Sequence, residues 1–255
     1  MERMIPLTIT GIPQFQFQSK DLDAARHFYQ TLLGLSPLAR EAHSLSLGMA
    51  AGRVDVYERP YDSELHAENA SAVGSQNFCF RASGDPEEAM AYLRSAGADL
   101  IEEQLHDRSG ALGPMKSFYL FDPDHNLVEL AFYEKKNRPM QLLAIDHLVL
   151  VSADYRRSLD FYEALCGAVQ RSEGHGVIQT GRQKLNIHHL KPRYTPHEPY
   201  AAIGSVTCTL TAAGNSALVK SELAALGLSY REDRSALCLF DPDGNLLRLM
   251  PEGGA

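Results

Sequence analysis

Several short segments of the chain alternate polar side chains, which can hold a ligand, with apolar ones, which can fill a core. Successive residues of a β-strand point to opposite faces, so the polar members of such a segment share one face. In the first half these polar residues are Gln14, Gln16, Gln18, Asp55, Tyr57, Asn77, Cys79 and Glu129. Amides and hydroxyls in this arrangement can bind an oxygen-rich molecule through hydrogen bonds. The carboxyl group of Glu129 can act as a general base or can anchor a cationic ligand.

The same alternation in the second half selects His147, Val149, Asn186, His188, Thr207, Thr209 and Arg248. Imidazole is a common metal ligand, so His147 and His188 form a candidate two-histidine metal site. The alternative interpretation is a pair of hydrogen-bonded pocket histidines. The sequence has no serine-hydrolase elbow and no glycine-rich phosphate loop, so serine-hydrolase and nucleotide-dependent chemistry lack support.

The segments that carry these residues occur twice, which indicates a tandem duplication. Three pairs of segments align in order: 12–34 with 145–167, 74–80 with 204–210, and 121–127 with 240–246. The sequence therefore predicts a first domain over 1–135, a polar linker over 136–141 and a second domain over 142–255.

Each half itself contains two similar β-α-β-β-β units. Asp21 and Asp85 are expected to cap the helices of the first half, and Gly34 follows the end of the first helix. The offset between the halves falls from 130 to 119 residues (204 − 74 and 240 − 121), so the first half carries an extra segment around 106–114. Its glycines and proline predict a loop.

Paired units of this kind, each pair ending in a strand–Asp-Pro-Asp–strand hairpin, resemble the vicinal oxygen chelate superfamily. This group includes glyoxalase I, bleomycin-resistance proteins, fosfomycin-resistance enzymes and extradiol dioxygenases, and the chain looks most like its small virulence-associated, glyoxalase-like members. The resemblance implies an α+β fold, in which four βαβββ units form two open, cup-shaped mixed sheets with the helices outside. It also implies that each half encloses one cup, with a ligand inside.

Metal-dependent members of this superfamily place ligands on three strands around a divalent ion. Carried over to this chain, the resemblance implies Gln14, Asn77 and Glu129 in the first half. In the second half it implies His147, Thr207 and Arg248. Both sets are incomplete, since amides bind metals weakly and a guanidinium repels a cation. A divalent ion such as Mn, Fe, Ni or Zn, held through Glu129, and no metal at all both remain open.

The extra segment of the first half favours the first cup as the main ligand site, because its Arg108 can pair with an anionic group. The expected ligand-binding residues are Gln14, Gln16, Asp55, Tyr57, Asn77, Arg108 and Tyr119. One hypothesis is a glyoxalase- or dioxygenase-type enzyme, a metal-dependent lyase or dioxygenase acting on a small oxygen-rich or aromatic molecule with Glu129 as metal ligand or base. The other is metal-independent binding or sequestration of such a molecule, as in bleomycin resistance.

Composition excludes several other classes of function. The 255 residues include 24 Lys and Arg against 32 Asp and Glu, a net charge of −8, which argues against a nucleic-acid or anionic-membrane partner. The chain has neither an apolar run of about 20 residues nor a signal-like N-terminus. Four cysteines without metal-type spacing fit a reducing compartment, so we expect a cytoplasmic protein. A small molecule is the expected partner, and the chain is expected to be a monomer or a homodimer.

Overall fold

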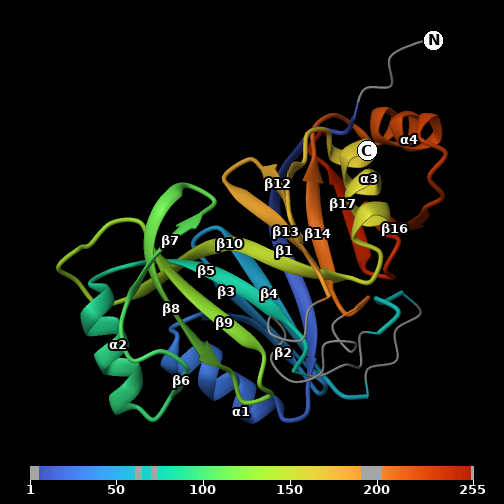
Figure 1. The fold of residues 1–255 in the computed structure, drawn as a ribbon. Helices are drawn as coiled ribbons and strands as arrows, with labels where there is room; N and C mark the ends of the chain where they lie inside the picture. The colour runs from blue at the N-terminus through green and yellow to red at the C-terminus, as the bar shows by residue number, and fades with distance from the viewer. Residues whose placement is uncertain (1–5, 61–64, 70–73, 191–202, 254–255) are drawn as a thin grey trace.

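The computed structural model describes residues 6–60, 65–69, 74–190 and 203–253 as four consecutive β-α-β-β-β units, of which the second has one additional strand (Figure 1). Unit 1 contains β1 (Ile9–Ser19), α1 (Leu22–Arg26), its π-helical continuation η1 (His27–Leu32), β2 (Ser36–Glu41), β3 (Ser44–Met49) and β4 (Gly52–Glu58). Unit 2 contains β5 (Asn77–Ser83), α2 (Pro86–Ser95), β6 (Asp99–Leu100), β7 (His106–Gly110), β8 (Gly113–Phe121) and β9 (Leu127–Phe132). Unit 3 contains β10 (Gln141–Ser152), α3 (Tyr155–Cys166), β11 (Gln170–Ser172), β12 (His175–Thr180) and β13 (Gln183–His189). Unit 4 contains β14 (Thr207–Ala212), α4 (Ser216–Ala225), β15 (Arg231–Asp233), β16 (Ala236–Phe240) and β17 (Leu246–Pro251).

A side-chain oxygen caps the first helix of every unit. Asp21 accepts hydrogen bonds from the backbone N–H groups of the first turn of α1, and Asp85 does the same for α2. Asp154 and Asn215 cap α3 and α4 in the same way. Such caps satisfy N–H groups that would otherwise lack partners, which explains why the helices begin at these residues. Within the described part of the chain, no helix is both long and apolar enough to cross a membrane.

The four units form two open mixed sheets, which confirms the predicted fold class. Sheet A has the strand order β15-β16-β17-β14-β1-β4-β3-β2, so it joins units 1 and 4. Sheet B has the order β11-β12-β13-β10-β5-β9-β8-β6, with β7 paired to β8, so it joins units 2 and 3. The expectation that each half of the sequence encloses its own cup is therefore wrong. The first strand of every unit offers a similar free edge, and alternation fixes which face a side chain takes but not which unit pairs at that edge.

The apolar faces of both sheets and the helices enclose one core. The rings of Phe15 on sheet A and Phe78 on sheet B lie 4.7 Å apart between centroids. In Figure 1, α1 and α2 lie at one end of the molecule and α3 and α4 at the other.

Two buried tyrosines connect the helix of one sheet to a turn of the other. The hydroxyl of Tyr29, in η1 after β1, donates to Asp122 between β8 and β9, at 2.6 Å. The hydroxyl of Tyr162, in α3 after β10, donates to Asp241 between β16 and β17, at 2.8 Å. Burial raises the pKa of Asp122 to about 6. The Asp-Pro-Asp turns and the helical Phe-Tyr pairs are thus parts of the core rather than of a ligand site.

Candidate functional site

The structure divides the predicted site residues between the two sheets. Gln14, Gln16, Asp55 and Tyr57 lie on sheet A. Asn77, Arg108, Tyr119, Glu129, His147 and His188 lie on sheet B. The two ligand sets carried over from the resemblance are divided in the same way, since Gln14 lies on a different sheet from Asn77 and Glu129. We name the polar faces of the two sheets cup A and cup B.

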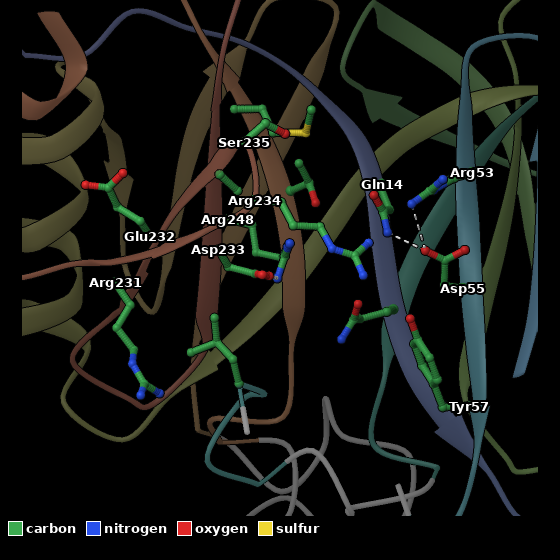
Figure 2. Close-up of a pocket in the computed structure, with 15 residues that line it drawn as sticks. Gln14, Arg53, Asp55, Tyr57, Arg231, Glu232, Asp233, Arg234, Ser235 and Arg248 are labelled. Atoms are coloured by element: carbon green, nitrogen blue, oxygen red, sulfur yellow. Dashed lines mark hydrogen bonds and ion pairs between the residues drawn. The ribbon is translucent and has the colours of Figure 1, made fainter. Parts of the chain in front are cut away.

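Cup A contains a row of four polar side chains on neighbouring strands. Arg53 on β4 pairs with Gln14 on β1, Gln14 pairs with Thr209 on β14, and Thr209 pairs with Arg248 on β17. A pocket of about 560 Å³ lies over this row. It is lined by Gln14, Gln16, Arg53, Asp55, Tyr57, Leu65, Thr209, Arg231, Glu232, Asp233, Arg234, Ser235, Ala236, Arg248 and Met250. Figure 2 shows two facing walls, one with Gln14, Arg53, Asp55 and Tyr57 and the other with residues 231–235 and Arg248.

Two aspartates orient the polar groups of cup A. The carboxylate of Asp55 is buried and accepts hydrogen bonds from the amide nitrogen of Gln14 and, at 2.6 Å, from the hydroxyl of Ser46. A guanidinium nitrogen of Arg53 lies 3.4 Å from the same carboxylate. On the opposite wall, Nη1 of Arg248 lies 2.7 Å from Oδ2 of Asp233. The two arginines are thus held by one carboxylate each.

The row in cup A does not fit a metal ion. Guanidinium groups are cationic and have no lone pair to donate, and they stand at two of the four row positions. The amide nitrogen of Gln14 is engaged by Asp55, and Thr209 supplies only a neutral hydroxyl. The side chains of this row can hold oxygen atoms or anions instead.

Cup B carries a different row at the equivalent positions. Lys184 on β13 pairs with His147 on β10, His147 with Cys79 on β5, Cys79 with Glu129 on β9, and Glu129 with Tyr119 on β8. Lys184, His147, Cys79 and Glu129 are all buried. Cys79 therefore takes the position that the resemblance assigned to Asn77, which lies beside Leu127 instead. The corresponding neighbour of Gln14 in cup A is Thr209, not Thr207.

Asp146 joins this cluster although it is adjacent to His147 in the sequence. The register of β10 against β5 shifts between Ile145 and His147, which leaves Asp146 as an extra residue. Such a bulge breaks the strict alternation of faces. Oδ1 of Asp146 lies 2.9 Å from Nδ1 of His147, and the other ring nitrogen, Nε2, lies 3.4 Å from Oε2 of Glu129. Alternation alone could not identify Asp146.

The donor set in cup B does fit a divalent metal. One ligand atom each from Cys79, Asp146 and His147 lie within 4.8 Å of one another, and Glu129 adds a carboxylate beside His147. Sulfur, imidazole nitrogen and carboxylate oxygen suit Zn²⁺ and other transition metals. His188 lies four residues beyond Lys184 along β13, and its ring is stacked edge-on against that of His175. The co-ligands nearest to His147 are therefore Cys79 and Asp146 rather than His188.

Burial and charge set the protonation of this cluster. Burial, with the negative charges of Glu129 and Asp146, raises the pKa of the Cys79 thiol far above its usual value, so the free thiol is neutral. Burial also raises the pKa of Asp146, but its contacts with His147 and Tyr133 outweigh this, and the net pKa is lowered. Burial, followed by the charges of His175, His147 and Lys184, lowers the pKa of His188 to about 4.

The segment around 106–114 is a β-hairpin rather than the expected loop, and it closes over cup B. Its backbone binds two groups of the cluster: Nζ of Lys184 donates to the carbonyl of Ser109 at 3.0 Å, and the N–H of Ala111 donates to Asp146 at 3.1 Å. Arg108 lies 4.7 Å above the ring of Tyr119 and forms an ion pair with Glu102. Because β7 pairs with β8, the extra residues extend the sheet.

Comparison with known proteins matches both the sequence pattern and the fold. Residues 11–130 match the model of the Glyoxalase/Bleomycin resistance protein/Dioxygenase superfamily. A virulence protein of Salmonella typhimurium is 26% identical over 129 residues, which are 51% of this chain and 88% of that protein. A glyoxalase domain-containing protein of Mycosarcoma maydis is 28% identical over 128 residues, 50% of this chain and 71% of that protein.

The fold likeness extends over both halves. The crystal structure of glyoxalase I from Zea mays aligns with 94% of this chain and 92% of its own, with a TM-score of 0.61 and 14% identity. At that identity the likeness concerns the fold alone. The resemblance stated above is confirmed for the first half of the chain, where residues 11–130 match the superfamily model, and the fold likeness extends over the second half.

Proposed function

We propose that this chain binds a small oxygen-rich molecule in cup A without the help of a metal ion. The observation that carries this proposal is the pocket of about 560 Å³ over a row in which arginines stand at both ends. Its volume lies within the range of small-molecule sites. The side chains around it supply hydrogen-bond donors of fixed orientation, while cup B is buried beneath its own hairpin.

The lining residues have different roles in this proposal. Gln14 offers an amide oxygen and Gln16 a complete amide group from β1, and Tyr57 offers an aromatic surface. Asp55 holds Gln14 and Arg53 in place and is a positioning residue in this proposal. Preoriented donors reduce the entropy lost when a ligand binds.

The test is ligand binding by protein stripped of metal with a chelator. A panel of small oxygen-rich and aromatic molecules is screened by thermal shift, and hits are measured by titration calorimetry. We expect binding that survives chelation, is weakened about tenfold or more by Gln14→Leu or Tyr57→Ala, and is unchanged by Gln170→Leu on the exposed edge strand β11. Binding that requires added metal, or that responds to Glu129→Gln in cup B and not to the cup A variants, would contradict the proposal.

A second candidate function is metal-dependent chemistry in cup B, favoured by the cluster of Cys79, Asp146 and His147 with Glu129 nearby. These four side chains would hold a divalent ion such as Zn, Fe, Mn or Ni. When bound, such an ion supplies Lewis acidity toward adjacent oxygens of a substrate. Without a bound ion, Glu129 would serve as a general base toward a ligand in cup B. In either case the β7–β8 hairpin would have to open to admit the small molecule.

Metal content decides this second candidate. Purified protein is analysed for bound metals and then loaded with Co²⁺, whose absorption spectrum reports a thiolate ligand. We expect stoichiometric binding and a thiolate band that Cys79→Ser abolishes and that Cys166→Ser, outside cup B, leaves intact. Stoichiometric binding that is unaffected by Cys79→Ser and by Glu129→Ala would place the metal elsewhere and end this candidate.

We further propose that the protein is a monomer. Units 1 and 4 complete sheet A and units 2 and 3 complete sheet B within one chain. A second copy is therefore not needed to supply a missing wall of either cup. Light scattering after size exclusion should give one chain per particle, and a stable dimer would contradict this proposal.

A further inference from the structure

The pocket of cup A gathers positive charge on a chain whose net charge is −8. Four arginines line it: Arg53, Arg231, Arg234 and Arg248. Its acidic residues are Asp55, Asp233 and Glu232, and Glu232 is paired with Lys220 at 2.8 Å. In Figure 2 the carboxylate of Glu232 points away from the pocket. The groups that face the pocket therefore carry an excess of positive charge.

Two of these arginines are oriented by ion pairs with carboxylates, and the other two form no ion pair with the described residues. Arg53 and Arg248 each touch one carboxylate, of Asp55 and Asp233 respectively. A guanidinium has five N–H donors, so a single ion pair leaves donors for a ligand. Arg231 and Arg234 are exposed and form no ion pair within the described part of the chain.

The spacing of the oriented pair suits a small anion between them. Arg53 and Arg248 lie on β4 and β17, which are separated by β1 and β14. Three interstrand spacings place their backbones roughly 14 Å apart. Two arginine side chains can close most of such a gap from opposite walls. A carboxylate or phosphate would then lie above Gln14 and Thr209, of which Thr209 carries a neutral hydroxyl donor.

We propose that the ligand of cup A is a small organic anion whose carboxylate or phosphate group is bound between Arg53 and Arg248. This inference rests on the proposed function and adds the chemical class of the ligand. Arg231 and Arg234 stand at the rim and attract the anion without fixing its position. Planar guanidinium groups bind carboxylate and phosphate through paired N–H···O bonds, which gives both affinity and orientation.

The inference is tested with pairs of probes that differ in charge but not in shape. Phthalate is compared with phthalamide, malonate with malonamide, and inorganic phosphate is titrated separately, all against metal-free protein by calorimetry and thermal shift. We expect the anions to bind and the amides to fail, with affinity falling at least tenfold between low and high salt. A stronger response to phosphate than to both carboxylates identifies the group as phosphate, and the reverse identifies it as carboxylate.

Variants locate the binding. Arg248→Gln and Arg53→Gln are expected to weaken anion binding at least tenfold, and Arg248→Lys to restore part of it. Arg171→Gln is the matched control, because Arg171 forms surface ion pairs on β11, the edge strand of sheet B, outside cup A. Circular dichroism and the melting temperature of each unliganded variant show whether it is folded. If Arg248→Gln fails to fold, anion binding is measured on Arg248→Lys instead. This variant retains the charge but lacks the planar guanidinium, and it should bind anions more weakly than wild type.

Two results would overturn the inference, and they are distinguishable. If the amides bind in a Gln14-dependent way and the anions do not, the anion class is wrong while cup A remains a ligand site. If anions bind equally well to Arg53→Gln, Arg248→Gln and wild type, the anion site lies elsewhere. If neither class binds and the panel of neutral molecules also fails, the proposed function fails with it.

Discussion

Nε2 of His147 lies 3.4 Å from Oε2 of Glu129, although His147 opens the second half of the sequence and Glu129 closes the first. The residue equivalent to Glu129 in the duplicated sequence is Arg248, which lies on the other sheet in the row of Gln14. Pairing of units across the halves thus collects the carboxylate and the imidazole in cup B. It leaves the row of cup A (Arg53, Gln14, Thr209 and Arg248) with guanidinium, amide and hydroxyl groups. The two cups of one chain therefore differ in chemistry: cup B collects potential metal ligands, and cup A collects arginines.

Replacement of Glu129 should destabilise the fold. Its carboxylate accepts a hydrogen bond from the buried hydroxyl of Ser117 at 2.6 Å and lies beside His147. Glu129→Ala leaves these buried groups without their partner, and we expect a loss of about 2–4 kcal/mol in the free energy of unfolding. Urea denaturation measures it. Glu134→Ala, on the exposed surface beside Lys136, should change stability by less than about 0.5 kcal/mol. Equal effects of the two variants would show that the cup B contacts contribute nothing.

The two tyrosine–aspartate bonds should contribute equally to holding the sheets together. Tyr29→Phe and Tyr162→Phe each remove one donor from a buried carboxyl group, of Asp122 and Asp241. We expect each variant to lose about 1–3 kcal/mol in chemical denaturation. Tyr92→Phe changes an exposed side chain of α2 and serves as the control. Losses no larger than that of the control would refute the role of these hydroxyls.

His188 should make stability depend on pH. Burial and neighbouring positive charges lower its pKa to about 4 in the folded protein, against about 6.5 when unfolded. Between these values the unfolded chain binds a proton that the folded chain does not. Acidification through this range therefore lowers the free energy of unfolding, by up to about 3 kcal/mol from this residue. His188→Gln should lose less stability than wild type between pH 7 and pH 4.5. His27→Gln, at an exposed helix position, should behave as wild type; a His188→Gln curve parallel to wild type would contradict the assignment.

The hairpin over cup B should open when Gly110 gains a side chain. A Cβ atom there would collide with the hydroxyl of Tyr133 and would lie 2.6 Å from the sulfur of Met115. We expect Gly110→Val to cost about 1–3 kcal/mol and to speed amide hydrogen exchange in β7 and Ala111. Ser109→Ala is the control, because Lys184 binds the backbone carbonyl of Ser109 and not its side chain. Unchanged exchange in Gly110→Val would mean that the hairpin does not close the cup through this contact.

The halves of the sequence should not behave as independent domains. Residues 1–135 contain β1 and β5, whose partners β14 and β10 belong to the second half. Expressed alone, each half should form dimers or aggregates through these open edges. Co-expression of 1–135 with 142–255 should restore a one-to-one complex that unfolds cooperatively. A monomeric first half with a sharp unfolding transition would show that the halves are self-sufficient.

The sequence by itself determined the units and the faces. Alternation placed Phe15 and Phe78 in the core, and both are almost fully buried. The capping residues Asp21 and Asp85 begin helices where expected. These features depend on interactions between residues close together in the chain, whose geometry the periods of strand and helix fix.

Only the tertiary structure decided which residues share a site. The partner of a strand edge is chosen by packing over the whole molecule, and four similar units offer four similar edges. Gln14 therefore lines the same pocket as Arg248, and Glu129 lies beside His147, through strand pairing that no local pattern encodes. Asp146 enters the cluster because a bulge interrupts the alternation that sequence reasoning depends on. The residue types can be read from the sequence, but their grouping into an arginine-lined cup and a cup of potential metal ligands arises from long-range strand pairing.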